Sequence, residues 1–164
     1  MENNETLVLS LFPNHRGLGF VCIEWPKKLL DAGMAVVHPV SNSQFLDRVI
    51  KYIDFFKPSV IIIRNCKGKK SDREKRIENI VDDITTYSEK NHIPIYGYTR
   101  QQIRDVFEQF GATTKNEIAK KIIEWFPQLE WRAPTIRKAW MDEDCNMGVF
   151  DAFALAVTHK YLTE

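Results

Sequence analysis

The chain has 164 residues, 44% of them hydrophobic, which is enough to bury one core but too little for two independent domains, so we expect a single domain over residues 1–164. Its 23 Lys and Arg nearly balance 22 Asp and Glu, and the net charge of +1 excludes a global attraction to nucleic acid or to acidic membranes. The three cysteines are widely spaced, which argues against a disulfide framework and favours the cytoplasm. The chain has no apolar run of about 18 residues, which argues against a membrane span.

The amino-terminal segment has the pattern of an antiparallel meander. Residues 6–12 are apolar and β-prone, and the turn-forming residues 13–17 separate them from a second apolar run at 18–24. A lysine-bearing connector that ends at Gly33 then leads to a third expected strand at 34–38. The sequence therefore predicts a hairpin that a third strand extends.

The middle of the chain alternates helices and strands. Ser41 is a suitable N-cap for an amphipathic helix that runs to Lys57, where Pro58 breaks it. The β-branched run 60–63 is typical of a strand buried on both faces. A charged segment at 71–91 with a helical apolar stripe, followed by a short strand at 93–96, predicts a β-α-β crossover and hence parallel pairing.

Three helices are expected in the remaining part of the chain, at 100–109, 115–126 and about 147–161. A loop that is rich in proline and tryptophan separates the second helix from the third. A meander followed by alternating strands and helices predicts an α/β fold with a mixed sheet covered by helices on both faces.

Several segments, in collinear order, resemble RuvC-type junction resolvases. They are 8–14, 58–63, 99–103, 111–118 and 151–159. The resemblance implies an RNase H-like (RuvC-like) fold, in which a five-stranded mixed sheet has an antiparallel meander followed by parallel strands. It also implies DNA or another nucleic acid as a partner and allows a homodimer.

The resemblance implies that the acidic metal site of these enzymes is largely lost here. Phe12, Arg64 and Gly148 stand where the family has carboxylates, and only Asp151 remains. Hydrolysis by two metal ions requires carboxylates, because Mg²⁺ and Mn²⁺ are hard cations. We therefore expect no metal and no cofactor. Because the family places positions 64 and 151 in one cleft, we expect Arg64 to pair with Asp151.

A local basic stretch is the best candidate for phosphate contact. Between positions 64 and 76, seven basic residues face only two acidic ones, and the resemblance adds a lysine at the start of a later helix. The expected contacts are Arg64, Lys67, Lys69, Lys70, Arg73 and Lys115. The alternative is that these charges are only a solvated loop and helix face.

The leading hypothesis is a catalytically degenerate RuvC-like domain that acts as a nucleic-acid-binding or accessory protein, with Asp151 as a catalytic remnant. One alternative is an active Mg²⁺- or Mn²⁺-dependent endonuclease, in which Glu143 and Asp144 join Asp151 in an altered acidic site. Another is a protein-interaction module on the same fold, which the neutral overall charge permits.

Overall fold

The computed structural model describes residues 6–25, 28–37, 41–66, 72–135 and 143–163, except for the side chain of Arg73. Its centre is a five-stranded sheet in the order β3-β2-β1-β4-β5. The strands are β1 (Thr6–Asn14), β2 (Gly17–Trp25), β3 (Lys28–Val36), β4 (Val60–Arg64) and β5 (Ile95–Tyr98). Strands β1, β2 and β3 pair antiparallel, whereas β4 pairs parallel with both β1 and β5. The predicted mixed sheet is confirmed.

The starts of two strands differ from the sequence-based prediction by two residues or more. Strand β3 begins at Lys28, so most of the expected connector before Gly33 is strand, paired to β2 through an irregularity between Cys22 and Ile23. Strand β3 lies at the edge of the sheet, and only two of its nine residues are buried, so it lacks the apolar pattern that marks a buried strand. Strand β5 begins at Ile95 rather than at residue 93.

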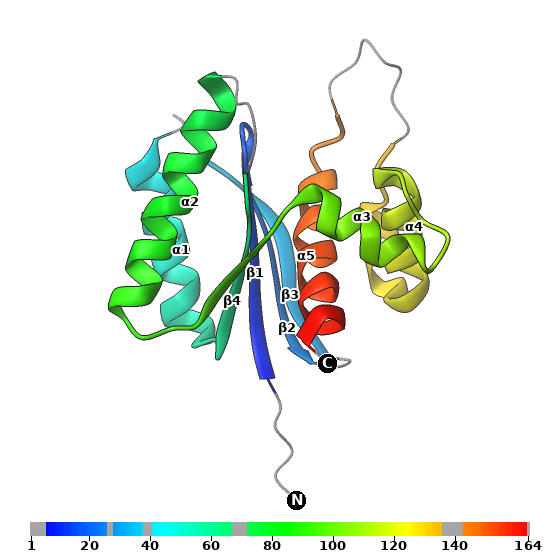
Figure 1. Cartoon of the computed structure of the whole chain (residues 1–164), viewed down its shortest axis with the longest axis horizontal. Helices are drawn as coiled ribbons and strands as arrows, with labels where there is room; N and C mark the ends of the chain where they lie inside the picture. Colours follow the sequence, from blue (N-terminus) through cyan, green and yellow to red (C-terminus); the bar gives the residue numbers. More distant parts are fainter. Residues whose placement is uncertain (1–5, 26–27, 38–40, 67–71, 136–142, 164) are drawn as a thin grey trace, which may run out of the picture.

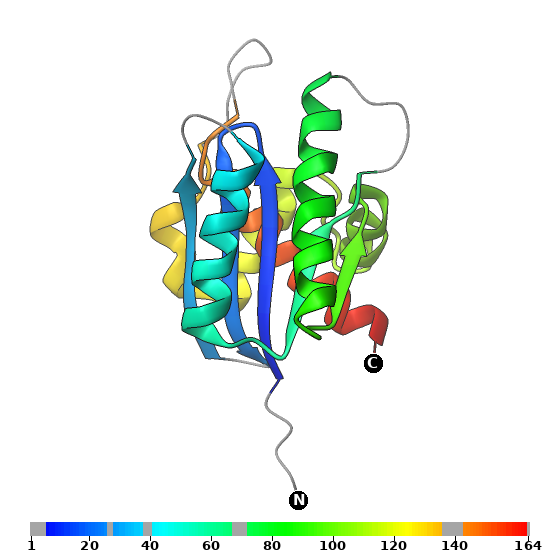
Figure 2. The ribbon, with the colours of Figure 1, turned by 90° about the vertical axis from the view of Figure 1, so that its left-hand side faces the viewer.

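Helices cover both faces of the sheet (Figures 1 and 2). The two helices on one face are α1 (Asn42–Phe56) and α2 (Asp72–Lys90). The other face carries α3 (Arg100–Glu108), α4 (Lys115–Trp125), the short 3₁₀ helix η1 (Pro127–Arg132) and α5 (Met147–Thr163). Ser41 caps α1 as predicted, because its side chain accepts a hydrogen bond from the Gln44 backbone N–H.

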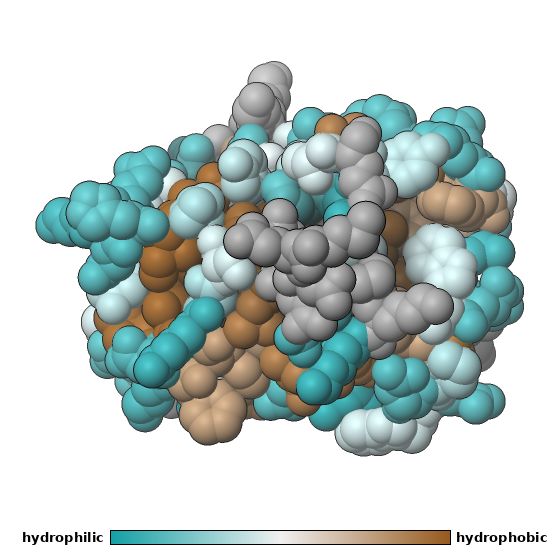
Figure 3. Space-filling view, turned by 90° about the horizontal axis from the view of Figure 1, so that it is seen from below, coloured by the Kyte–Doolittle hydropathy of each residue, from teal (hydrophilic) through white to brown (hydrophobic). Residues whose placement is uncertain are grey.

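The sheet separates two apolar layers. One lies between the sheet and α1 with α2, and the other is formed by α5 with α3 and α4 against the opposite face. Helix α5 is the centre of this second layer, since every residue from Met147 to Thr158 is buried. No helix in the described part of the chain is long and apolar enough to cross a bilayer. Figure 3 shows the end of the molecule beneath the start of β1, where brown apolar side chains alternate with teal polar ones.

Candidate functional site

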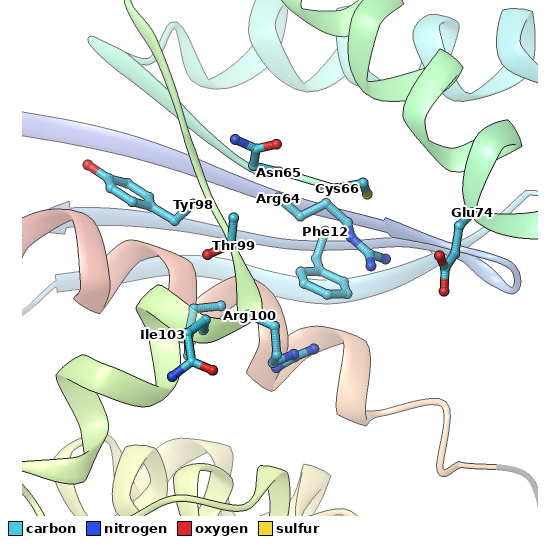
Figure 4. A pocket seen from close by; sticks show the side chains of 10 residues that line it. Phe12, Arg64, Asn65, Cys66, Glu74, Tyr98, Thr99, Arg100 and Ile103 are labelled. Carbon is cyan, nitrogen blue, oxygen red and sulfur yellow. The ribbon is translucent and has the colours of Figure 1, made fainter. Parts of the chain in front are cut away.

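A pocket of about 380 Å³ lies where the carboxyl ends of β1, β4 and β5 meet (Figure 4). Parallel strands end at the same edge of a sheet, and this edge is where α/β proteins commonly bind ligands. Residues from all three strand ends, from the first turn of α2 and from the start of α3 line the pocket. They are Phe12, Arg64, Asn65, Cys66, Glu74, Tyr98, Thr99, Arg100, Gln101 and Ile103.

Strand register and a helix cap bring the two arginines of the pocket together. Arg64 is the last residue of β4 and pairs with Tyr98 of β5. Thr99 follows directly and caps α3 with a reciprocal capping box, in which its side chain accepts from the Gln102 backbone N–H. Arg100 is therefore the first residue of α3, one position beyond the cap. The end of β4 and the start of α3 thus deliver two guanidinium groups to one place.

Both guanidinium groups contact the ring of Phe12, which is only 4% exposed. The Cζ atom of Arg64 lies 4.3 Å from the ring centroid and that of Arg100 lies 5.3 Å from it. In Figure 4 the two side chains approach the ring from opposite sides. Arg64 is also fixed by donation from Nη1 to the backbone oxygen of Pro13 at 2.9 Å. Cation–π attraction to a buried ring holds both cations at the pocket wall.

Asp151 of α5 is ion-paired with two cations that converge on it from other helices. Its side chain is 5% exposed, and Oδ1 accepts a hydrogen bond from Arg100 Nη1 at 3.0 Å. Lys115, the first residue of α4, has its Nζ 3.8 Å from Asp151 Oδ2 and 2.7 Å from Glu143 Oε1. The expected pairing of Asp151 with Arg64 is wrong: Arg100 takes that position because α3 starts beside α5, and Arg64 instead turns to β1.

The other candidate carboxylates are engaged in different contacts. Asp144 is buried, and its carboxylate accepts the backbone N–H groups of Thr135 and Asn146 at 2.9 Å each, so it organises the approach to α5. Glu143 is the partner of Lys115. Within the ranges that the structure describes, no group of three or more His, Cys, Asp or Glu side chains could hold a metal ion.

Helix α5 lies unusually close to the sheet next to this site. A Cβ atom added to Gly19 of β2 would lie 2.2 Å from the backbone oxygen of Gly148, and one added to Gly148 would lie 2.7 Å from Met34 Sδ and 3.2 Å from Asn14 Nδ2. A carboxylate at position 148 would therefore have to displace Met34. Together with an aromatic ring and an arginine at the other positions, this donor set does not fit a pair of hard divalent cations.

The remaining candidate phosphate contacts are only partly described. Arg64 lines the pocket, and Lys115 lies beyond Asp151 as part of the ion pairs described above. Lys67, Lys69 and Lys70 lie outside the described residues. Arg73 is in α2, whose next residue, Glu74, lines the pocket.

Arg100 is the main site residue that the sequence analysis missed. The sequence did contain a usable signal. Arg100 comes directly after Thr99, a suitable helix N-cap, and Thr99 comes directly after the strand that pairs parallel with β4. The helix that begins at Arg100 must therefore start at the same sheet edge as Arg64. Tyr98, also missed, lines the pocket and its hydroxyl is 2.7 Å from His159 Nδ1. Burial raises the pKa of Tyr98, and burial followed by the charge of Lys160 lowers the pKa of His159.

Comparison with known proteins gives matches among solved structures. No protein-family model and no curated protein sequence matches the chain. Thermus thermophilus RuvC in complex with Holliday junction substrate has a TM-score of 0.72 at 16% identity, covering 96% of this chain and 94% of that one. The yeast mitochondrial Holliday junction resolvase Ydc2 has a TM-score of 0.64 at 9% identity, covering 94% and 78%.

A viral protein also matches. The fowlpox virus resolvase in complex with Holliday junction DNA has a TM-score of 0.54 at 12% identity, covering 94% of this chain and 99% of that one. These likenesses, together with the strand order and the helices on both faces, show that the chain has the RuvC-like, RNase H-like fold.

Proposed function

We propose that this chain is a RuvC-like domain that binds nucleic acid and does not cleave it with metal ions. The Thermus thermophilus and fowlpox virus structures hold Holliday junction DNA, which supports nucleic acid as the class of partner. The pocket at the ends of β1, β4 and β5 is the proposed binding centre, and the basic stretch that begins at Arg64 is its proposed extension.

One observation carries this proposal: cationic side chains occupy the place where the resemblance expects metal-binding carboxylates. Arg64 and Arg100 surround Phe12, and Asp151 is paired with Arg100. A divalent ion about 5 Å from one guanidinium group is repelled by about 7 kcal/mol at an effective dielectric constant of about 20. The same charges attract phosphate. The two guanidinium groups at the pocket wall therefore favour the approach of a phosphate oxygen over that of a divalent cation.

The test combines binding and cleavage of the same DNA. Fluorescence anisotropy with a four-way junction, a fork and a duplex should show binding that weakens steeply with salt. Plasmid and junction cleavage in Mg²⁺ or Mn²⁺ should give no product, and calorimetry should detect no Mn²⁺ binding. Cleavage by the wild-type protein that disappears in Asp151→Asn would overturn the proposal and support the endonuclease alternative with Glu143 and Asp144.

The same binding series tests the basic stretch and the remaining alternative. Replacing Lys67, Lys69 and Lys70 together by Gln should flatten the log-log salt slope on duplex DNA by about 0.9 for each phosphate that the variant no longer neutralises. An unchanged slope removes this segment from the interface. If the wild-type protein binds none of the three DNAs at low salt, nucleic-acid binding is wrong and the protein-interaction module is favoured.

A further inference from the structure

We propose that the guanidinium groups of Arg64 and Arg100 bind one internal phosphodiester of a nucleic acid in the β1-β4-β5 pocket without any divalent cation. The inference rests on the proposed function for the choice of nucleic acid as ligand. It goes further in naming the group that is bound, the residues that bind it and its independence of metal.

The donors are fixed before a ligand arrives. Each guanidinium carries five N–H donors in a rigid fork. Within the described part of the chain, Arg64 uses Nη1 for the Pro13 backbone oxygen and Arg100 uses Nη1 for Asp151, so donors remain for a ligand. The buried Phe12 ring restrains both groups. Planar guanidinium forks match the oxygens of a phosphate, and little side-chain entropy is lost when both are already anchored.

The charge and size of the pocket favour a phosphodiester. Glu74 lines the same pocket from α2 (Figure 4) and adds a negative charge to it. Glu74 and the Asp151 carboxylate that pairs with Arg100 keep the net charge around the two guanidinium groups low, which suits the single negative charge of an internal phosphodiester better than the higher charge of a terminal phosphate. The pocket volume of about 380 Å³ far exceeds the roughly 10 to 15 Å³ that one water molecule needs, which leaves space for the phosphate group and the attached sugar.

The experiment measures DNA affinity in EDTA and in Mg²⁺ for variants that remove one donor set at a time. Arg64→Gln removes the charge and keeps a polar side chain that is two bonds shorter. Arg100→Gln is combined with Asp151→Asn, because the single change leaves a buried carboxylate without its closest partner and the variant could fail to fold. Arg104→Gln is the matched control, since Arg104 is an exposed arginine of the same helix and does not line the pocket. Thermal melts confirm that each variant is folded.

We expect the wild-type protein to bind at least as well in EDTA as in Mg²⁺ at matched ionic strength, because Mg²⁺ competes for the DNA phosphates and does not contribute to the contact. Arg64→Gln and the Arg100→Gln/Asp151→Asn double variant should each weaken binding about tenfold, as the loss of a charged hydrogen bond does. Because both arginines contact the same phosphate, Arg64→Gln should flatten the salt slope on duplex DNA by less than the roughly 0.9 expected for a whole phosphate contact. Arg104→Gln should stay within about twofold of the wild type, which is the size of a surface charge effect.

Three results would overturn the inference while leaving nucleic-acid binding in place. The pocket variants could bind like Arg104→Gln, which would put the phosphate elsewhere. Binding could require Mg²⁺, which would mean that a metal mediates the contact. A 5′-phosphorylated strand could bind much better than the same strand with a 5′-hydroxyl, which would replace the internal phosphodiester by a terminal phosphate. Loss of all DNA binding by the wild-type protein in both buffers would instead refute the proposed function.

Discussion

The ion pair between Arg100 and Asp151 makes a prediction about stability whose sign separates two roles for the carboxylate. A carboxylate kept for metal ions is poorly compensated without them, and its neutralisation generally stabilises the fold. Here Asp151 is 4% exposed and accepts a 3.0 Å hydrogen bond from Arg100, with Lys115 at 3.8 Å. Neutralisation should therefore destabilise the fold, because a hydrogen bond to a charged group contributes about 1.5 to 3 kcal/mol.

A double-mutant cycle in urea at pH 7 measures this contribution. Asp151→Asn keeps an acceptor oxygen and the side-chain volume, so we expect a loss of about 1 to 2 kcal/mol. Arg100→Gln leaves a buried carboxylate with Lys115 as its remaining described partner. Breaking a fully buried pair costs about 3 to 5 kcal/mol, and because the Arg100 side chain is 28% exposed, water should reduce the loss to about 2 to 3 kcal/mol.

The double variant should lose less than the sum of the single losses, because the interaction between the two side chains can be lost only once. We expect a coupling free energy of at least about 1 kcal/mol between the two sites. Asp151→Gln, which has the wrong length for the same contact, is a useful comparison. A coupling below about 0.5 kcal/mol, or a stabilising Asp151→Asn, would refute the argument that Arg100 has taken over the charge compensation of this carboxylate.

Three further predictions concern packing and titration. Gly19→Ala should destabilise the protein by about 1 to 3 kcal/mol, since the new Cβ would meet α5 backbone at 2.2 Å, whereas Gly97→Ala, with a nearest contact of 3.4 Å, should leave the melting temperature nearly unchanged. Burial lowers the pKa of His159, so the unfolded chain binds more protons than the folded chain as the pH falls through about 6.5. The free energy of unfolding should therefore decrease as the pH falls through this range. In a series of melts at different pH, His159→Gln should flatten this pH dependence of stability. Burial and the charge of Asp31 raise the pKa of Cys22 to about 12. A thiol reagent should therefore label the exposed Cys145 in the native protein and Cys22 only after unfolding. Labelling of Cys22 in the native protein would contradict its buried placement.

The sequence predicted those elements whose pattern results from burial on a whole face or from a local cap. The run 60–63 is entirely apolar because β4 is covered on both faces, and the cap at Ser41 is a contact between neighbours in the chain. Edge strand β3 was predicted too short because only two of its nine residues are buried, so burial selects little of an alternating apolar pattern there. The resemblance also predicted that Phe12, Arg64 and Gly148 stand in place of carboxylates, because a missing carboxylate is visible from residue identity alone; this stays a prediction.

Residue identity alone did not determine what the remaining Asp151 binds. Its partner Arg100 is 51 positions away, and the choice of Arg100 over Arg64 depends on where α3 starts relative to α5. The position of Arg64 over Phe12 likewise depends on the parallel register of β1 and β4. Charge compensation inside a protein depends on distances of a few ångströms between segments that are remote in sequence, and only the tertiary structure sets those distances.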